Sequence, residues 1–422
     1  MDKPFDSHAI TTLFRVKVPV SDLRIGMYVC ELDRPWLDSP FLFQGFALAT
    51  QADIKAVQEA CEYVYVDSYK TKYPETADTQ RPIRSSQISW TAASPQKRVS
   101  VEQEIDNARN THKQTSNLVK TFMDEIRFGR GVDIQLAKEA VSECVDSIYK
   151  NPDAMLLLTQ LKNRDEYTSE HSMNVCIFSI VLGRYMGMPV HELRNLGLSG
   201  LMHDMGKMKV PLEILNKPGR LTDAEMALMK AHTVHGRDIL MSSRGIYAGA
   251  IDVAHGHHEN LDGTGYPRGL TDTQISPFTR IIAVADTYDA ITSDRVYQPG
   301  RTHMEAIGLL NKEGGRHLDG ELAVKFIECL GIYPAGSIVE MSNEEVALVI
   351  EVNPRQKLKP KVIMLLDQDK NPQSHRIVDL AKLDLDPFGQ PYRIKAILKN
   401  GTYNLDIRQY HERGLVQKAA AL

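Results

Sequence analysis

The pattern of apolar positions changes its period along the chain, and the first change separates an N-terminal segment. Short runs rich in valine and tyrosine, RVKVPV, MYVCEL and YVYVD, alternate as strands do. Between them, QADIKAVQEAC has the spacing of an amphipathic helix. These runs predict a small α/β domain over residues 1–70, without an evident cluster of catalytic residue types.

The next segment is polar and then becomes helical. Residues 71–100 are rich in Thr, Ser, Pro, Gln and Arg, which predicts a linker. Residues 101–150 place large apolar side chains at helical spacing, and Gly129 and Gly131 interrupt them, which predicts two connecting helices. We expect these helices to pack on the following domain; a dimer contact or a signal relay is the alternative.

Residues 151–335 predict an almost continuous series of helices. The sequence from Thr222 to Glu225 has the form of a capping box that opens LTDAEMALMKAHTVHGRDIL. Ser276 and Pro277 supply a cap and a first-turn proline for PFTRIIAVADTYDAI. The runs SIVEM, VALVIEV and KVIMLLD then predict a β-rich C-terminal extension over residues 336–422. The expected fold is mainly α, with a helical catalytic domain between these two smaller parts.

Composition narrows the function classes. The 422 residues are enough for two or three domains. A formal net charge of −4 gives no basis for bulk nucleic-acid binding, so phosphate affinity would need a local site. No apolar run reaches the roughly 18 residues of a membrane span, and the N-terminus lacks the apolar core of a signal peptide. The five cysteines form no CxxC pair, so we expect reduced cysteines and a cytoplasmic location.

Histidine carries most of the chemical information. Several histidines and aspartates stand in stretches whose apolar neighbours predict burial: His171, His203, Asp204, His232, His257, His258 and Asp286. A single buried histidine is usually a hydrogen-bonded core residue, and an unpaired buried carboxylate is strongly unfavourable. The convergence of this set on one helical bundle therefore predicts a metal centre.

The ligand types indicate which metals and what chemistry to expect. Imidazole and carboxylate ligands without cysteine suit Fe or Mn, with Co, Ni, Mg or Zn as alternatives. The set is larger than one ion usually takes, so two divalent ions are expected, and Asp204 is able to bridge them. A metal-bridging hydroxide would attack phosphorus. Lys207 would neutralise a phosphate oxygen; a solvated surface lysine is the alternative.

At this point the motifs resemble a known family. His203-Asp204 with Gly206-Lys207 is similar to the HDxGK core of the HD phosphohydrolase superfamily. HHENLDGTGYPRGL resembles the signature of its HD-GYP subfamily, and IIAVADTYDAITSDRVY resembles the helix that follows. The resemblance covers residues 150–335 and implies an HD-type helical bundle. Residues 14–70 resemble, more loosely, a small N-terminal domain often attached to such enzymes.

The resemblance implies roles for individual residues. It implies that the seven histidines and aspartates named above are metal ligands and that Asp204 and Lys207 are catalytic. It implies phosphate contacts for Lys207 and Arg295, and a substrate loop formed by Asp262, Gly263, Gly265, Tyr266 and Pro267. From the residues themselves, the loop glycines allow close backbone approach, and ligating histidines need orienting partners, for which the candidates are Glu259, Asp262 and Asp289. His191, His235 and His255 lie off the motifs and are expected to be structural or surface residues.

The chain departs from the family pattern at two positions. Some members carry a glutamate that supports a third metal where this chain has Tyr167, so two ions are expected. Members often end the DRPYR or DRPYK motif with a cation where this chain has Gln298. We expect a weaker hold on one phosphate as a result.

The resemblance implies hydrolysis of cyclic di-GMP to pGpG as the expected function, with GMP as a further product still open. The alternatives are hydrolysis of another cyclic dinucleotide such as cyclic GMP-AMP, and a sensor that binds the nucleotide without turnover. The intact ligand set argues against a sensor, and the GYP loop argues against a general HD phosphohydrolase. A homodimer and signalling protein partners remain open.

Overall fold

The computed structural model describes most of the chain, in the ranges 15–33, 46–67, 99–160, 167–293, 300–386, 389–405 and residue 407. The chain divides into two compact units, with the boundary between Thr91 and Ala92. Most of the predicted linker, residues 71–98, lies outside the described residues.

The N-terminal unit is a four-stranded antiparallel sheet with one helix. Its sheet has the order β1-β4-β2-β3, and its elements are β1 (Arg15–Pro19), β2 (Tyr28–Leu32), β3 (Phe46–Ala47), α1 (Gln51–Ala60) and β4 (Tyr63–Asp67). Thr50 and Asp53 form a capping box that starts α1. Ile54 and Val57 of this helix share a buried apolar cluster with Val64 and Val66 of the sheet. The predicted small α/β domain is confirmed.

The second unit begins with a helical bundle. Its helices are α2 (Val101–Arg127), α3 (Ile134–Lys150), α4 (Pro152–Leu158), α5 (Tyr167–Tyr185), α6 (Val190–Met202), the short 3₁₀ helix η5 (Met205–Lys209), α7 (Leu212–Leu215), α8 (Asp223–Lys230), α9 (His232–Ser242), α10 (Ala248–Gly256), α11 (Pro277–Thr292), α12 (His303–Glu313) and α13 (Gly320–Leu330). Within the described segments, no helix combines the length and apolar character needed to cross a membrane.

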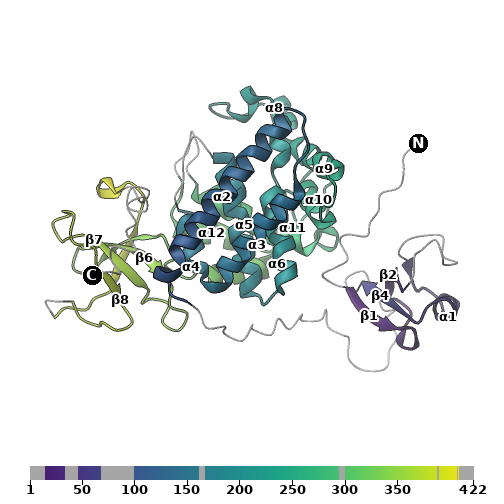
Figure 1. Ribbon diagram of the computed structural model, residues 1–422, viewed down its shortest axis with the longest axis horizontal. Coiled ribbons are helices and arrows are strands. Elements are labelled where there is room, and N and C mark those ends of the chain that lie inside the picture. Colours follow the sequence, from purple (N-terminus) through teal and green to yellow (C-terminus); the bar gives the residue numbers. More distant parts are fainter. Residues whose placement is uncertain are drawn as a thin grey trace. The chain divides into compact units, whose positions relative to one another are not determined.

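The helices predicted as connectors, α2 and α3, pack into this bundle. Gly129, with a φ of +76°, follows the end of α2, and the Asp133 side chain caps α3 by accepting from two backbone amides. The buried faces of α2 and α3 pack against each other and against α5 (Figure 1). They belong to the same compact unit as the rest of the bundle.

The helix predicted to run through LTDAEMALMKAHTVHGRDIL is two helices, and this part of the prediction is wrong. The Thr222–Glu225 capping box opens α8 as expected. The chain then breaks at Ala231, and His232 starts α9. At the break, the His232 side chain bonds to the carbonyl of Met229 at 2.7 Å. Side chains that take carbonyls at a helix end compete with continuation of the helix.

The C-terminal part of the second unit is a five-stranded antiparallel sheet in the order β8-β7-β6-β5-β9. Its strands are β5 (Ile338–Met341), β6 (Val346–Glu351), β7 (Lys361–Leu366), β8 (Ile377–Asp379) and β9 (Ile394–Leu398). The amide of Val352 donates to Asp153 of α4 at 3.2 Å, and Lys361 pairs with Glu102 of α2 at 3.3 Å. The sheet is thus attached to the beginnings of two bundle helices, and the predicted mainly α fold with a β-rich extension is confirmed.

Candidate metal centre

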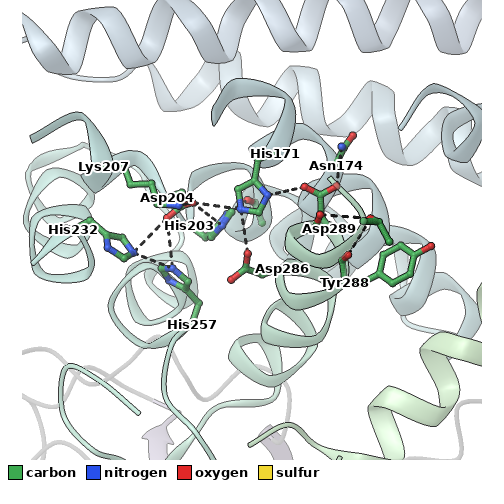
Figure 2. A network of polar contacts seen from close by, with 12 residues as sticks. His171, Asn174, His203, Asp204, Lys207, His232, His257, Asp286, Tyr288 and Asp289 are labelled. Carbon is green, nitrogen blue, oxygen red and sulfur yellow. Dashed lines mark hydrogen bonds and ion pairs between the residues drawn. The ribbon is translucent and has the colours of Figure 1, made fainter. Parts of the chain in front are cut away.

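Several elements of the bundle bring the predicted ligands to one place. The ligands lie on or beside separate helices: His171 on α5, His203 after α6, Asp204 before η5, His232 at the start of α9, His257 and His258 after α10, and Asp286 on α11. Figure 2 shows the labelled members of this set facing one another. His171, His203, Asp204, His232 and His257 are each at most 3% exposed. Helix ends therefore supply most of the set, where the backbone turns inward.

Four of the histidine rings are oriented so that Nε2 of each ring faces the centre. In these four rings Nδ1 is bonded outward, in the pairs His171–Asp289 Oδ2 at 2.8 Å, His203–Gly200 O at 2.7 Å, His232–Met229 O at 2.7 Å and His257–Val253 O at 3.1 Å. A ring whose Nδ1 donates to oxygen carries its lone pair on Nε2. This is the tautomer that binds a metal through Nε2 while an outer oxygen fixes the ring.

Asp204 lies between two groups of histidines. Its Oδ2 is 3.4 Å from Nε2 of His171 and 3.4 Å from Nε2 of His203. Its Oδ1 is 3.4 Å from Nε2 of His232 and 3.6 Å from Nε2 of His257. One carboxylate thus offers one oxygen to each group.

The donor atoms fit bound metal ions. One group of ligand atoms within 4.8 Å of one another comes from His171, His203 and Asp286. Another comes from His232, His257 and His258. Nε2 of His203 and Oδ1 of Asp204 are buried without a hydrogen-bond partner. Such atoms are costly inside a protein unless a ligand satisfies them, and mixed imidazole and carboxylate donors suit divalent transition metals.

Burial and local charge set the protonation of most ligands. Burial lowers the pKa of His232 to about 4 and also lowers the pKa of His203 and His258. Burial opposes ionisation of Asp204, but the Lys207 charge, the His203 charge and neighbouring hydrogen bonds hold its pKa well below 3.8. At Asp286, the hydrogen bond and charge of His171 outweigh burial and lower the pKa in the same way. Neutral rings and ionised carboxylates are the forms that bind metals.

His171 differs from the other rings. Burial lowers its pKa, but hydrogen bonds to Asp204, Asp286 and Asp289 outweigh burial and raise the pKa well above 6.5. The three carboxylates around the ring therefore favour positive charge at Nε2. A divalent ion at Nε2 would supply that charge in place of a proton.

Asp289 and Asn174 support His171 from behind. Asp289 is 0% exposed, and its Oδ2 contacts Nδ1 of His171. Its Oδ1 accepts a hydrogen bond from Nδ2 of Asn174 at 3.0 Å. The sequence indicates Asp289 as an orienting candidate, whereas Asn174 was not predicted. The available signal was a polar residue one turn after His171 on the buried face of α5.

Lys207 lies at the edge of the centre. Its Nζ is 2.5 Å from Oδ2 of Asp204, and its side chain is 21% exposed. The segment before it needs a glycine, because a Cβ on Gly206 would overlap the carbonyl oxygen of His232 and the amide nitrogen of Gly236. The close approach of η5 to α9 therefore fixes where the lysine starts. The role of Lys207 toward a phosphate stays a prediction.

The predicted substrate loop lies beside His258. Gly263 adopts a φ of +78°, which favours glycine. The Tyr266 ring lies 4.8 Å from the His258 ring at an angle of 32°. Nζ of Lys230 lies 4.8 Å from the centre of the Tyr266 ring, a cation–π contact that was not predicted from the sequence. Tyr266 thus joins the end of α8 to a predicted metal ligand.

Glu259 and Asp262 were candidates for orienting the predicted histidine ligands, but their carboxylates bond to other groups. Oδ1 of Asp262 accepts from the amide of Thr264 at 3.0 Å, and its Oδ2 accepts from Nε of Arg316 at 3.3 Å. Glu259 accepts from backbone amides of the loop. The loop folds back on its own beginning, so its backbone N–H groups reach these carboxylates instead of the imidazoles.

Other predicted positions are not tested by the structure. Arg295 and Gln298 lie outside the described residues, as does the side chain of Tyr167. The predicted phosphate contact of Arg295 and the weaker phosphate hold at Gln298 therefore stay predictions. The same is true of the exclusion of a third metal by Tyr167.

Models of known families match the N-terminal, central and C-terminal parts of the chain. An HD domain model matches residues 156–322. A model of a domain of unknown function matches residues 15–137, across the N-terminal unit, α2 and the beginning of α3. A model of a KOW domain associated with HD domains matches residues 338–384, within the C-terminal sheet.

Several named proteins are similar to this chain in sequence. A cyclic di-GMP phosphodiesterase of Pseudomonas aeruginosa is 38% identical over 370 residues, 87% of this chain and 89% of its own length. A cyclic di-GMP phosphodiesterase of Thermotoga maritima is 34% identical over 193 residues, 46% of this chain and 52% of its own. A 3′3′-cGAMP-specific phosphodiesterase of Vibrio cholerae is 36% identical over 160 residues, 38% of this chain and 37% of its own.

The bundle, the histidine–aspartate centre and these matches define a metal-dependent phosphodiesterase of the HD type. The chain belongs to the HD-GYP subfamily of the HD phosphohydrolase superfamily.

Proposed function

We propose that this enzyme hydrolyses cyclic di-GMP to pGpG with two divalent metal ions, Fe or Mn, held on either side of Asp204. The observation that carries the proposal is the position of Asp204, which offers one oxygen to each histidine group. The substrate follows from the Pseudomonas aeruginosa relative, whose name is cyclic di-GMP phosphodiesterase and whose similarity spans 87% of the chain.

One set of residues would hold the metal ions, and another would contact the phosphate. His171, His203 and Asp286 would hold one ion, and His232, His257 and His258 the other. When bound, such a pair activates water and stabilises the charge of an in-line displacement at phosphorus. The chain itself limits the access of bulk water, since most residues of the ligand set are buried.

Lys207 would act on the charge of the substrate. Its ammonium group already compensates Asp204 at 2.5 Å and is partly exposed. A cation at this position stabilises negative charge that develops on a non-bridging phosphate oxygen. Tyr266, stacked on His258, would form one side of the substrate site. Arg295 is proposed as a second phosphate contact.

Hydrolysis of cyclic GMP-AMP is the second candidate. It is favoured by the 36% identity with the Vibrio cholerae enzyme, which is named as specific for 3′3′-cGAMP. The metal centre would serve both substrates, because the attacked phosphodiester group is the same. The difference must therefore lie in contacts with the base.

Product analysis of metal-loaded protein tests the proposal. The protein is purified under low oxygen with Mn or Fe, its metal is counted, and products from cyclic di-GMP and cyclic GMP-AMP are separated by chromatography. We expect two ions per chain and pGpG from cyclic di-GMP; GMP would add a second hydrolytic step. Two bound ions without turnover of either nucleotide would contradict the proposal in favour of a sensor.

A further inference from the structure

The loop after α10 folds back on its own starting point. The amide of Tyr266 donates to the carbonyl oxygen of His258 at 3.1 Å. A Cβ on Gly265 would overlap the backbone of Glu259 and Asn260, so only glycine allows this approach. The second arm of the loop therefore lies directly against the residues that follow the ligand pair.

Glu259 holds that second arm through both of its carboxylate oxygens. Its side chain is 0% exposed. Oε1 accepts from the amide of Arg268 at 2.8 Å, and Oε2 accepts from the amide of Leu270 at 2.8 Å. Hydrogen bonds from backbone amides to a buried carboxylate are charge-assisted and strong, so Glu259 closes the loop.

Arg268 extends the same connection to two helices. Its Nε lies 3.7 Å from Oε1 of Glu259, and its Nη2 lies 3.3 Å from Oδ1 of Asp252 on α10. The other oxygen of Asp252 accepts from Oγ1 of Thr279 on α11 at 3.2 Å. Gly256 leaves room for the guanidinium group, because a Cβ there would lie 2.8 Å from Nη2. These helices lead to His257 and carry Asp286.

We propose that Glu259 is a positioning residue that, with Arg268 and Asp252, forms a latch on the substrate loop. The latch keeps the Tyr266 ring on His258 and so shapes the substrate side of the centre. The effect on substrate binding rests on the proposed function, whereas the latch itself does not. Glu259 thus acts on substrate binding through the loop and leaves orientation of His171 to Asp289.

The substitution Glu259→Gln separates the latch from simple burial. Glutamine has the same shape but offers one oxygen, and its NH₂ group would face one of the two loop amides. Glu345→Gln is the matched control, because Glu345 is also a buried glutamate (6% exposed) that accepts several hydrogen bonds, but lies in the C-terminal sheet.

The metal-loaded variants are compared by hydrogen exchange, metal content and kinetics. In Glu259→Gln we expect faster amide exchange in a peptide that contains Arg268 and Leu270, with the metal content unchanged. KM for cyclic di-GMP should rise about tenfold with kcat within about threefold, because a loosened loop weakens ground-state and transition-state binding alike. Glu345→Gln should change none of these quantities.

A double-substitution cycle tests whether Glu259 acts through Tyr266. In a Tyr266→Ala background, Glu259→Gln should raise KM less than about twofold, because the residue it positions is absent. Full additivity of the two changes would contradict that route. Arg268→Gln, at a side chain that is 35% exposed, loosens the same latch if Glu259→Gln fails to fold.

The outcomes distinguish the latch from other roles. Unchanged exchange at Arg268 and Leu270 would overturn the proposal. Loss of metal together with a fall in kcat would also overturn it, since Glu259 would then support a ligand. If the wild-type protein turns over no cyclic dinucleotide, the proposed function fails by itself, and exchange and metal content still decide the latch.

Discussion

Two polar clusters in this chain are each centred on buried side chains, but they differ in how completely those side chains are hydrogen-bonded. In the C-terminal sheet, Glu345 accepts from Tyr392 Oη at 2.8 Å, Asn343 Nδ2 at 2.9 Å, Gln373 Nε2 at 3.2 Å and Arg376 Nη2 at 3.2 Å. In the metal centre, Nε2 of His203 and Oδ1 of Asp204 have no hydrogen-bond partner. Glu345 and Tyr392 in the first cluster, like His203 and Asp204 in the second, are largely removed from water.

The difference distinguishes buried polar groups that stabilise the fold from buried polar groups that form a binding site. A satisfied carboxylate such as Glu345 contributes to the fold, because its donors compensate its desolvation. Buried atoms without a hydrogen-bond partner, such as Nε2 of His203 and Oδ1 of Asp204, are costly in themselves and favour a bound cation. The completeness of hydrogen bonding, more than the number of charges, separates a binding site from a structural cluster.

The largest expected effect is at the metal centre. The double substitution His203→Ala with Asp204→Ala removes a ligand from the centre and the carboxylate shared by both histidine groups. Turnover of cyclic di-GMP, the proposed substrate, should fall at least about 10³-fold, because the proposed metal pair would no longer be held to activate water. Metal counting and product chromatography measure the result. His191→Ala, at an exposed position outside the centre, is the control, and a double variant that keeps its rate and metal would place the centre elsewhere.

A smaller effect is expected behind the centre. Asp289→Asn keeps the shape of the side chain but removes the charge that holds Nδ1 of His171. Metal affinity should fall about 10- to 100-fold, as for other outer partners of ligating histidines. Titration with Mn²⁺ measures it. Asp319→Asn, at the cap of α13, keeps a capping side chain and should leave affinity unchanged; equal affinity in Asp289→Asn would show that Asp289 only packs.

The smallest effect is expected in the satisfied cluster and is on stability. Glu345→Gln should lower the free energy of unfolding by about 1–3 kcal/mol at neutral pH, because several donors lose a charged acceptor. Burial raises the pKa of Glu345, but hydrogen bonds from Asn343, Tyr392 and Gln373 and the Arg376 charge lower it below 4.5 overall.

The lowered pKa of Glu345 sets the sign of the pH dependence. Its stabilisation is complete above pH about 4.5 and is lost as the pH falls through the lowered pKa. The stability difference between wild type and Glu345→Gln should therefore shrink in acid, as measured by urea unfolding over a pH series. A difference that stays constant in acid would mean that the charge of Glu345 does not contribute.

Much of the fold followed from local patterns. Strands β1, β2 and β4, the division between α2 and α3, and strands β5, β6 and β7 were predicted from periodicity and turn residues, whereas β3, β8 and β9 were not. The break between α8 and α9 was not, because LTDAEMALMKAHTVHGRDIL has no glycine or proline at Ala231. The break places the His232 ring against the Met229 carbonyl, and helical spacing alone does not predict this contact.

By itself, the sequence determined the residue types of the metal centre and the family to which the chain belongs, because the motifs that carry this information are short and continuous. Only the tertiary structure decided that Asp204 lies between two histidine groups, that Asn174 supports Asp289, and that Glu259 closes the loop. These relations join atoms on separate helices or on opposite arms of one loop. Their distances depend on how helices pack and on close backbone approach at Gly206 and Gly265, and a one-dimensional pattern does not contain those distances.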